Sequence, residues 1–135
     1  MLKIDFTNEI VFSFNGPNLC MLGNENDFLQ LAKVVSELTG ANGVNIELKK
    51  QHFVKYTGDN KEVIFTSKTG SNLLGTFDNN GRLLFELDPR YWERLFKYFV
   101  LMSWNKSTYY LNEYESCLND LKLIQECNFI CSSEF

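Results

Sequence analysis

The chain has 135 residues, of which 44% are hydrophobic and 22% charged, and its net charge is −4. This length suits one domain of ordinary size, and the composition excludes a disordered chain. A core of this size needs no disulfide or metal to be stable, so we expect one domain over residues 1–135.

The ends of the chain and its cysteines bear on location. The first residues, Met1–Phe6, alternate apolar and charged side chains, which is unlike a signal peptide. No stretch approaches the roughly 20 apolar residues of a membrane helix. We therefore expect a cytoplasmic protein without a membrane segment, in which the four cysteines are thiols: Cys20, Cys117, Cys127 and Cys131.

Residues 2–7 open the chain with the alternation of a half-buried strand. Apolar side chains at Ile10, Phe12 and Phe14 continue this alternation and predict a second strand. The next four residues, 15–18, combine Asn, Gly and Pro and predict a loop.

A helix is predicted next, because apolar residues recur at helical spacing between Phe28 and Leu38. Asn26 or Asp27 could cap its start, and Gly40 or Gly43 could end it.

Five strands are then predicted in succession, at 44–48, 52–57, 62–67, 72–77 and 82–87. The last two flank Asp78-Asn79-Asn80-Gly81, a strong hairpin signal because Asn and Gly tolerate positive φ. Strands in such succession predict a meander and a mostly antiparallel sheet.

Asp88 and Pro89 predict the start of a second helix, since Asp is a favoured N-cap and Pro suits the first helical position. The helix is expected to end near Trp104 and Asn105. Its apolar stripe predicts a buried face made of Trp92, Leu95, Phe96, Phe99 and Val100.

The C-terminal part of the sequence contains a segment that fits two kinds of element. Residues 107–111 fit either a strand or a helix, because Thr108-Tyr109-Tyr110 favours a strand. Apolar residues at 111, 114, 118 and 121 predict a last helix running to about Glu126, after which Phe129 and Ile130 return to the core. The fold class is therefore α+β, with a mostly antiparallel sheet of five or more strands packed against two or three helices.

The sequence shows no pattern typical of catalysis, of a cofactor or of a metal. His52 is the only histidine, and the cysteines lack the paired spacing of a zinc site. The carboxylates Glu113 and Glu115 would point to different faces of a helix, and Asp88 is explained as a cap. No glycines form a phosphate-binding loop. We expect a protein that is not an enzyme and that binds neither a cofactor nor a metal.

The net charge lies entirely at the C-terminal end. Residues 1–112 hold twelve acidic and twelve basic residues, whereas residues 113–135 hold five acidic residues and Lys122. Such a field repels nucleic acid and attracts a basic partner, although a solvated helix face would look the same. Five lysines lie on or beside the predicted strands: Lys49, Lys50, Lys55, Lys61 and Lys68. They could bind RNA or DNA, but because the pI is near 5.0 we favour the other explanation, that they keep edge strands from pairing with other chains.

Three segments together give the chain a family resemblance: the strands from Val44 to Leu87, the helix that opens with Asp88-Pro89-Arg90-Tyr91-Trp92, and the acidic end from Glu113. In these general features, the chain resembles the small immunity proteins of bacterial toxin systems, such as those of contact-dependent growth inhibition systems. The resemblance implies a cytoplasmic protein that binds a cognate toxin nuclease domain and blocks its active site.

Acidic and aromatic side chains are interleaved in the segment that would contact such a partner. Toxin nucleases are usually basic, so acidic groups would speed association, and tyrosines would anchor the contact. The expected partner-binding residues are Tyr109, Tyr110, Glu113, Tyr114, Glu115 and Asp120.

Two other classes of function fit the same observations. One is a phage- or plasmid-type inhibitor of a host nuclease or defence complex, and the other is a small ligand-binding domain or enzyme with a pocket between sheet and helices. The sequence does not decide the oligomeric state.

Overall fold

A computed structural model describes residues 1–11, 13–58, 61–112 and 122–135. These residues form two α-helices, one short 3₁₀ helix and nine strands. In chain order the elements are β1 (Leu2–Thr7), β2 (Asn18–Leu22), α1 (Glu25–Thr39), β3 (Asn45–Glu47), η1 (Leu48–Lys50), β4 (Val54–Gly58), β5 (Val63–Ser67), β6 (Asn72–Phe77), β7 (Leu83–Leu87), α2 (Pro89–Trp104), β8 (Thr108–Tyr110) and β9 (Asn128–Ser132).

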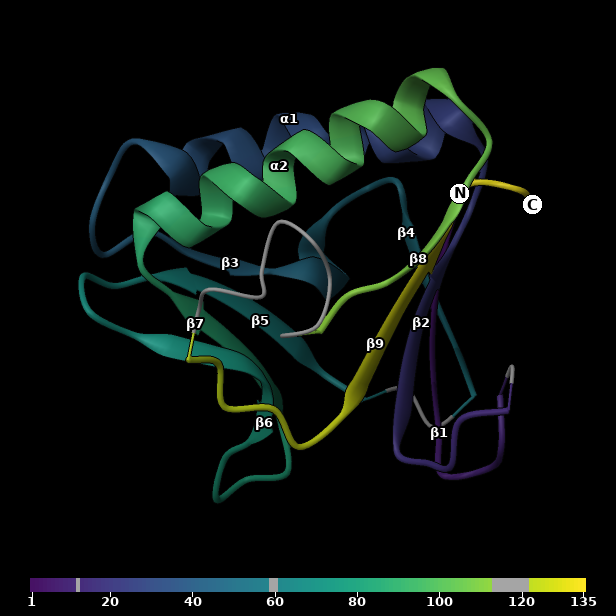
Figure 1. Ribbon diagram of the computed structural model, residues 1–135, viewed down its shortest axis with the longest axis horizontal. Coiled ribbons are helices and arrows are strands. Elements are labelled where there is room, and N and C mark those ends of the chain that lie inside the picture. Colours follow the sequence, from purple (N-terminus) through teal and green to yellow (C-terminus); the bar gives the residue numbers. More distant parts are fainter. Residues whose placement is uncertain (12, 59–60, 113–121) are drawn as a thin grey trace.

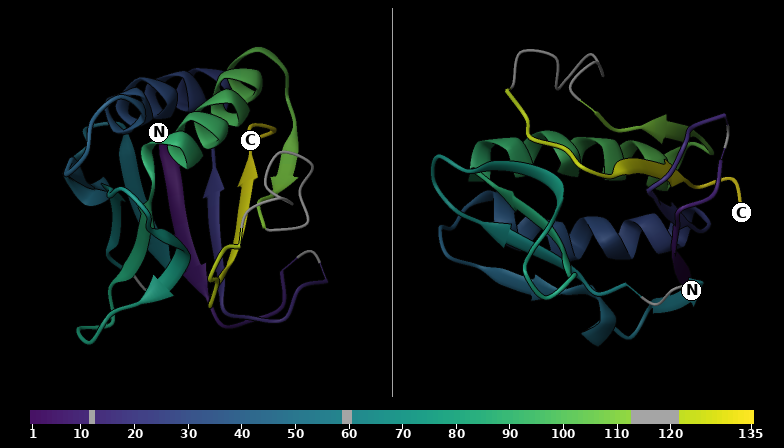
Figure 2. Two further views of the ribbon diagram at one scale, coloured as in Figure 1. Left: turned by 60° about the vertical axis from the view of Figure 1, so that its left-hand side comes forward. Right: turned by 90° about the horizontal axis from the view of Figure 1, so that it is seen from below.

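The two helices lie side by side in one layer, and both sheets lie beneath them (Figures 1 and 2). The five-stranded sheet has the order β4-β1-β2-β9-β8, and the four-stranded sheet has the order β3-β5-β7-β6. Aromatic rings pack between the elements. The rings of Phe85 in β7 and Phe129 in β9 connect the two sheets, with 4.8 Å between their centroids. Phe28 in α1 and Phe99 in α2 connect the two helices, with 6.2 Å between their ring centroids. The core therefore lies where the two sheets and the helical layer meet.

The α+β class is confirmed, but the single, mostly antiparallel sheet is not. Four strand pairings are antiparallel, and the pairings β1–β4, β2–β9 and β5–β7 are parallel. The predicted meander is divided, because β4 leaves its sequence neighbours and pairs with β1. Turn residues indicate where the chain reverses, but they do not indicate which strands pair. The pairing depends on the burial of apolar side chains that are far apart in the sequence.

The second strand lies later in the chain than predicted. It is β2, whereas Ile10 is 68% exposed in a loop, and Phe12 lies outside the described residues. The run Leu19-Cys20-Met21 is buried without alternation, because β2 lies between β1 and β9 and is covered on both faces. A continuous apolar run of this kind is typical of a central strand and lacks the period-two signal.

The N-cap of α1 lies two or three residues earlier than the predicted caps. Asn24 is the N-cap, and its side-chain oxygen accepts the N–H of Asp27 at 2.9 Å. Asp27 in turn accepts the N–H of Asn24 at 2.9 Å, which completes a capping box. Gly40 ends the helix, as one of the two predicted alternatives.

The predicted start of α2 is confirmed. Asp88 is the N-cap, Pro89 is the first helical residue and Asn105 follows the last. The Asp88 carboxylate accepts hydrogen bonds from the N–H of Gly70, from the N–H of Arg90 and from Nε of Arg90, at 3.0, 3.0 and 3.1 Å. These donors, with the Gly70 N–H as the largest cause, lower the pKa of Asp88 to about 2.

This low pKa predicts an acid-dependent loss of stability. Because the pKa of Asp88 is lower in the folded chain than its ordinary value of 3.8, its contribution is complete above about pH 4 and is lost as the pH falls toward 2. Asp88→Ala is expected to lower the free energy of unfolding at pH 7 by about 1–3 kcal/mol, through the lost cap and hydrogen bonds. Asp88→Asn, which keeps a capping side chain, should lose less and flatten the pH dependence between 4 and 2. Urea unfolding at several pH values measures both effects, and parallel curves for wild type and Asp88→Asn would contradict the assignment.

The apolar face of α2 is rotated slightly from the predicted stripe. Trp92, Leu95 and Phe99 are buried as predicted, but Phe96 and Val100 are only half-buried. Tyr98 is buried instead, and its ring packs at 4.9 Å against that of Tyr109. Tyr98 follows Leu95 by three residues and therefore lies on the same helical face, which the predicted stripe left out.

Strand β8 settles the ambiguous segment 107–111 in favour of a strand. The N–H of Leu111 donates to the carbonyl of Phe129 at 2.8 Å and extends the pairing of β8 with β9. Phe129 and Ile130 are buried in β9, as expected. Of the predicted last helix, residues 113–121 lie outside the described part of the chain, and residues 122–126 are not helical.

Candidate functional site

The edge strand β8 places two neighbouring tyrosines on opposite faces of the five-stranded sheet. Tyr109 points inward and packs against Tyr98 of α2. Tyr110 points outward and is 37% exposed, and its ring centroid lies 4.9 Å from that of Phe14. This division follows from the strand geometry, in which successive side chains alternate between faces.

Phe14 reaches Tyr110 because two asparagines hold the loop between β1 and β2 against the sheet. The Asn18 amide donates to the carbonyls of Glu9 and Phe14 at 2.9 and 3.1 Å. The Asn128 amide donates to the carbonyl of Asn15 and to Oδ1 of Asn18, both at 2.9 Å. Asn18 is fully buried, so its bonds replace water and fix the loop.

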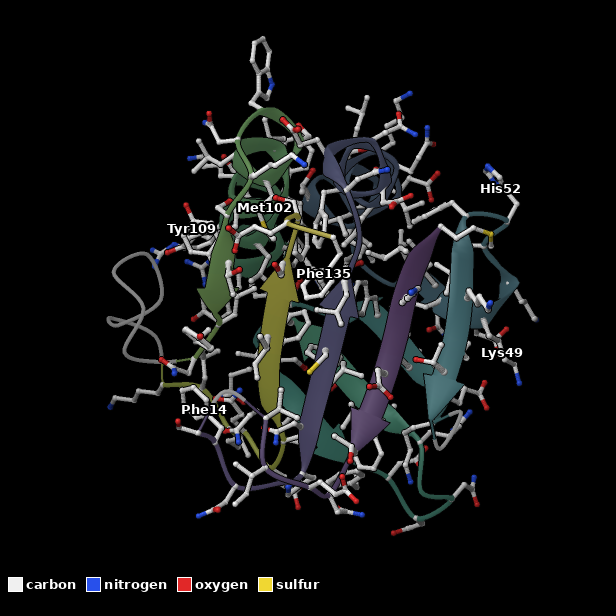
Figure 3. The ribbon with its side chains drawn as sticks, turned by 90° about the vertical axis from the view of Figure 1, so that its right-hand side faces the viewer. Phe14, Lys49, His52, Met102, Tyr109 and Phe135 are labelled. Carbon is white, nitrogen blue, oxygen red and sulfur yellow. The ribbon has the colours of Figure 1, made fainter. Side chains whose placement is uncertain are left out.

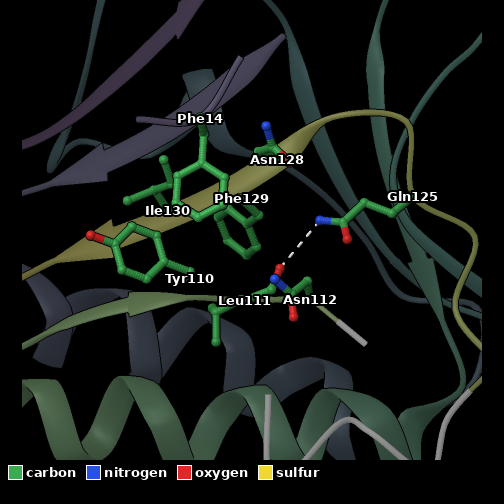
Figure 4. Close-up of a pocket in the computed structure, with 8 residues that line it drawn as sticks. All are labelled: Phe14, Tyr110, Leu111, Asn112, Gln125, Asn128, Phe129 and Ile130. Atoms are coloured by element: carbon green, nitrogen blue, oxygen red, sulfur yellow. Dashed lines mark hydrogen bonds between the residues drawn. The ribbon is translucent and has the colours of Figure 1, made fainter. Parts of the chain in front are cut away.

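A shallow hollow lies beside the Phe14 and Tyr110 rings (Figure 4). The Gln125 side-chain amide donates to the carbonyl of Leu111 at 3.2 Å at its margin. Its cavity volume is about 10 Å³, which is room for about one water molecule, whereas typical small-molecule pockets measure roughly 300–1,000 Å³. Its lining consists of Phe14, Tyr110, Leu111, Asn112, Gln125, Asn128, Phe129 and Ile130. The hollow is therefore too small to hold a whole ligand.

The residues that line the hollow flank the acidic segment, which begins at Glu113, in the sequence. Asn112 lines the hollow and is followed directly by Glu113, while Gln125 lines the hollow from the other end of the segment. We call the combination of Phe14, Tyr110 and the hollow the β8 surface. Among the expected partner-binding residues, Tyr110 lies on this surface and Tyr109 does not. The remaining four lie outside the described residues: Glu113, Tyr114, Glu115 and Asp120.

Sequence reasoning missed Phe14, Asn18 and Asn128. Phe14 falls in a predicted strand. The two asparagines lie next to apolar residues, and these residues dominate the pattern of their segments. The dipeptide Pro17-Asn18 gave only a loop signal. Nothing in one sequence reveals that an asparagine near position 18 bonds another 110 residues later.

Three cysteines lie in the core as free thiols: Cys20, Cys127 and Cys131. Burial, with a smaller effect of the Asp5 charge, raises the pKa of Cys20 to about 11. Burial likewise raises the pKa of Cys127 to about 12 and that of Cys131 well above its ordinary value. Such thiols carry little thiolate at neutral pH and are poor nucleophiles.

These pKa values predict slow modification of the folded chain. At pH 8, Cys20, Cys127 and Cys131 should react with a thiol reagent only as fast as the chain opens, and all three should react at once in denaturant. Mass spectrometry of digested samples locates the labels. A reductant or a chelator should leave the melting temperature unchanged, and rapid labelling of Cys20 in the native chain would show that its neighbourhood is open.

Neither His52 nor Glu86 belongs to a group of metal ligands among the described residues. His52 is exposed before β4 and points outward (Figure 3), and Glu86 accepts the hydroxyl of Ser71 at 2.9 Å. Within residues 1–11, 13–58, 61–112 and 122–135, no three His, Cys, Asp or Glu side chains are grouped closely enough to hold a metal ion.

The helices found in the described residues are too short or too polar to span a membrane. Comparisons of the chain with protein-family models, with curated proteins and with solved structures gave no match.

Proposed function

We propose that the chain is a cytoplasmic immunity protein that binds a basic toxin domain of the nuclease class and covers its active site through the β8 surface. The observation that carries the proposal is the tilted contact of the Phe14 and Tyr110 rings. This aromatic pair is partly exposed, and three residues after Tyr110 the chain enters the acidic segment that begins at Glu113. Aromatic side chains beside a small hollow are typical anchors of protein interfaces.

Charge and shape have separate roles in this proposal. The acidic residues from Glu113 onward attract a basic nuclease over a long range and raise the association rate. The Phe14 and Tyr110 rings make short-range contacts that slow dissociation, at a small entropic cost because tyrosine and phenylalanine have few rotatable bonds. The toxin domain would lose access to its phosphate-bearing substrate because the acidic segment occupies the cationic surface.

The proposal predicts a gene for a basic toxin domain beside the gene for this chain, and the test is the rate of association with that domain. Reversing Glu113 and Glu115 to Lys should slow association about tenfold or more at low salt, and the difference should shrink at high salt. The matched control reverses Glu37 and Glu93, two exposed acidic residues of the helices, and changes the net charge equally. The control should have a much smaller effect, because it lies away from the β8 surface.

Two results would contradict the proposal. One is the absence of binding between the folded chain and that toxin domain. The other is an equal loss of association rate in both double variants, which would trace the effect to total charge and not to the acidic segment. Protection of bacteria that express the toxin domain gives an independent measure of inhibition.

A further inference from the structure

Strand β4 has an open edge. It forms one border of the five-stranded sheet and pairs only with β1 among the described strands. The N–H of Leu2 donates to the carbonyl of Phe53 at 2.8 Å, which fixes the parallel ladder. In this register the backbone groups of Lys55 and Thr57 face β1, and those of Tyr56 face away from the sheet.

The outward backbone groups of Tyr56 have no partner in the described chain, since β4 pairs with β1 alone. The Tyr56 side chain extends toward β5, because its hydroxyl oxygen accepts the N–H of Val63 at 3.2 Å. It therefore does not cover the backbone groups of Tyr56. The N–H of Val54, by contrast, already donates to the carbonyl of Gln51 at 3.1 Å. The edge at Tyr56 therefore offers one N–H and one carbonyl for a further strand.

The outer face beside this edge is basic. Lys3 of β1 and Lys55 of β4 are register partners, and both are exposed. Neither forms an ion pair with any described residue, whereas Lys49 and Lys50 of η1 pair with Glu62 and Glu47. In Figure 3, β4 stands at the border of its sheet, with the labelled side chains of Lys49 and His52 pointing outward on the same side.

The two lysines determine which kind of strand can pair with the open edge of β4. A second copy of β4 would bring its own Lys55 near Lys3 and Lys55, and like charges opposite one another destabilise a strand pair. An acidic segment added beside β4 would place carboxylates next to Lys55, with Lys3 one strand further in, and neither lysine has an ion-pair partner among the described residues. Asp5, the neighbouring acid of that face, is half-buried and lies close to Gly58 and Cys20.

We infer that β4 is a docking edge for an extended acidic segment of a partner protein, which adds to the five-stranded sheet as a further strand. Backbone hydrogen bonds at Tyr56 hold the segment, its carboxylates at alternate positions contact Lys55 of the adjacent strand, and the charge of Lys3 one strand further in adds to the attraction. The site lies at the opposite border of the sheet from β8, so it does not depend on the proposed toxin inhibition.

The probe is a short, end-capped peptide of alternating Glu and Val residues. Its binding is followed by fluorescence anisotropy, and amide hydrogen exchange is followed by NMR. The peptide should slow exchange of the Tyr56 N–H about tenfold or more. Exchange at Val54 and Thr57 should change little, because their N–H groups are already bonded. A peptide with N-methylated amides, or with Lys in place of Glu, should bind at least about tenfold more weakly.

Lys3→Glu with Lys55→Glu should abolish binding of the acidic peptide. The matched control, Lys33→Glu with Lys106→Glu, changes two exposed lysines elsewhere and should keep it. Four results would overturn the inference: no binding of the acidic peptide; binding without slower exchange at Tyr56; a dimer of the free chain that protects Tyr56; or binding of a single-stranded oligonucleotide at Lys3 and Lys55 in place of the peptide.

Discussion

Trp92→Ala is expected to lower the free energy of unfolding by about 3–5 kcal/mol, the largest loss of stability that we predict for one substitution. The side chain is fully buried, and its ring centroid lies 4.8 Å from that of Phe65 in β5. Its Nε1 donates to the carbonyl of Thr66 at 2.8 Å. The substitution would leave a cavity between α2 and the four-stranded sheet and would also remove the partner of a backbone carbonyl.

The other tryptophan provides a matched control. Trp104 ends α2 and is 77% exposed, so Trp104→Ala should change the free energy of unfolding by less than about 0.5 kcal/mol. Trp92→Phe keeps much of the ring and loses the hydrogen bond, and it should fall between the two. Urea unfolding followed by circular dichroism measures all three without relying on tryptophan fluorescence. Equal losses for Trp92→Ala and Trp104→Ala would contradict the packing of α2.

Tyr110→Ala is expected to weaken binding of the toxin domain about thirtyfold, which corresponds to roughly 2 kcal/mol, mainly through faster dissociation. Tyr110 is partly exposed, so the free energy of unfolding should fall by much less than for a core residue. Phe14→Ala should have a similar effect on binding. Because the two rings touch, the double variant should lose less than the sum of the two single losses.

The adjacent Tyr109 gives the sharpest control for this prediction. Its ring packs on Tyr98 toward the interior, so Tyr109→Ala should destabilise the fold and leave the affinity of the folded protein unchanged. Dissociation rates and urea unfolding of both tyrosine variants separate the two roles. If Tyr109→Ala and Tyr110→Ala exchange these effects, the surface that binds the partner is not the one around Phe14.

The sequence alone determined the features that depend on neighbours in the chain. The cap at Asp88 with Pro89 behind it, the turn at residues 78–81 with the strand β7 after it, and the alternating period of β1 all appear where they were predicted. Each depends on hydrogen bonds or side-chain spacing within a few residues, so the signal and the structure lie in the same stretch. The α+β class followed from the order of these elements.

The tertiary structure alone decided which strands pair and which side chains reach the surface. The parallel partners of β1, β2 and β5 are separated from them by many residues, and no local pattern encodes that choice. The same holds for Asn18 and Asn128, whose bond places Phe14 on Tyr110. Tyr109 and Tyr110 look alike in the sequence, and only the pairing of β8 with β9 decides which ring faces the core. Local signals fix elements, whereas burial of apolar surface between distant elements fixes their arrangement and the candidate site.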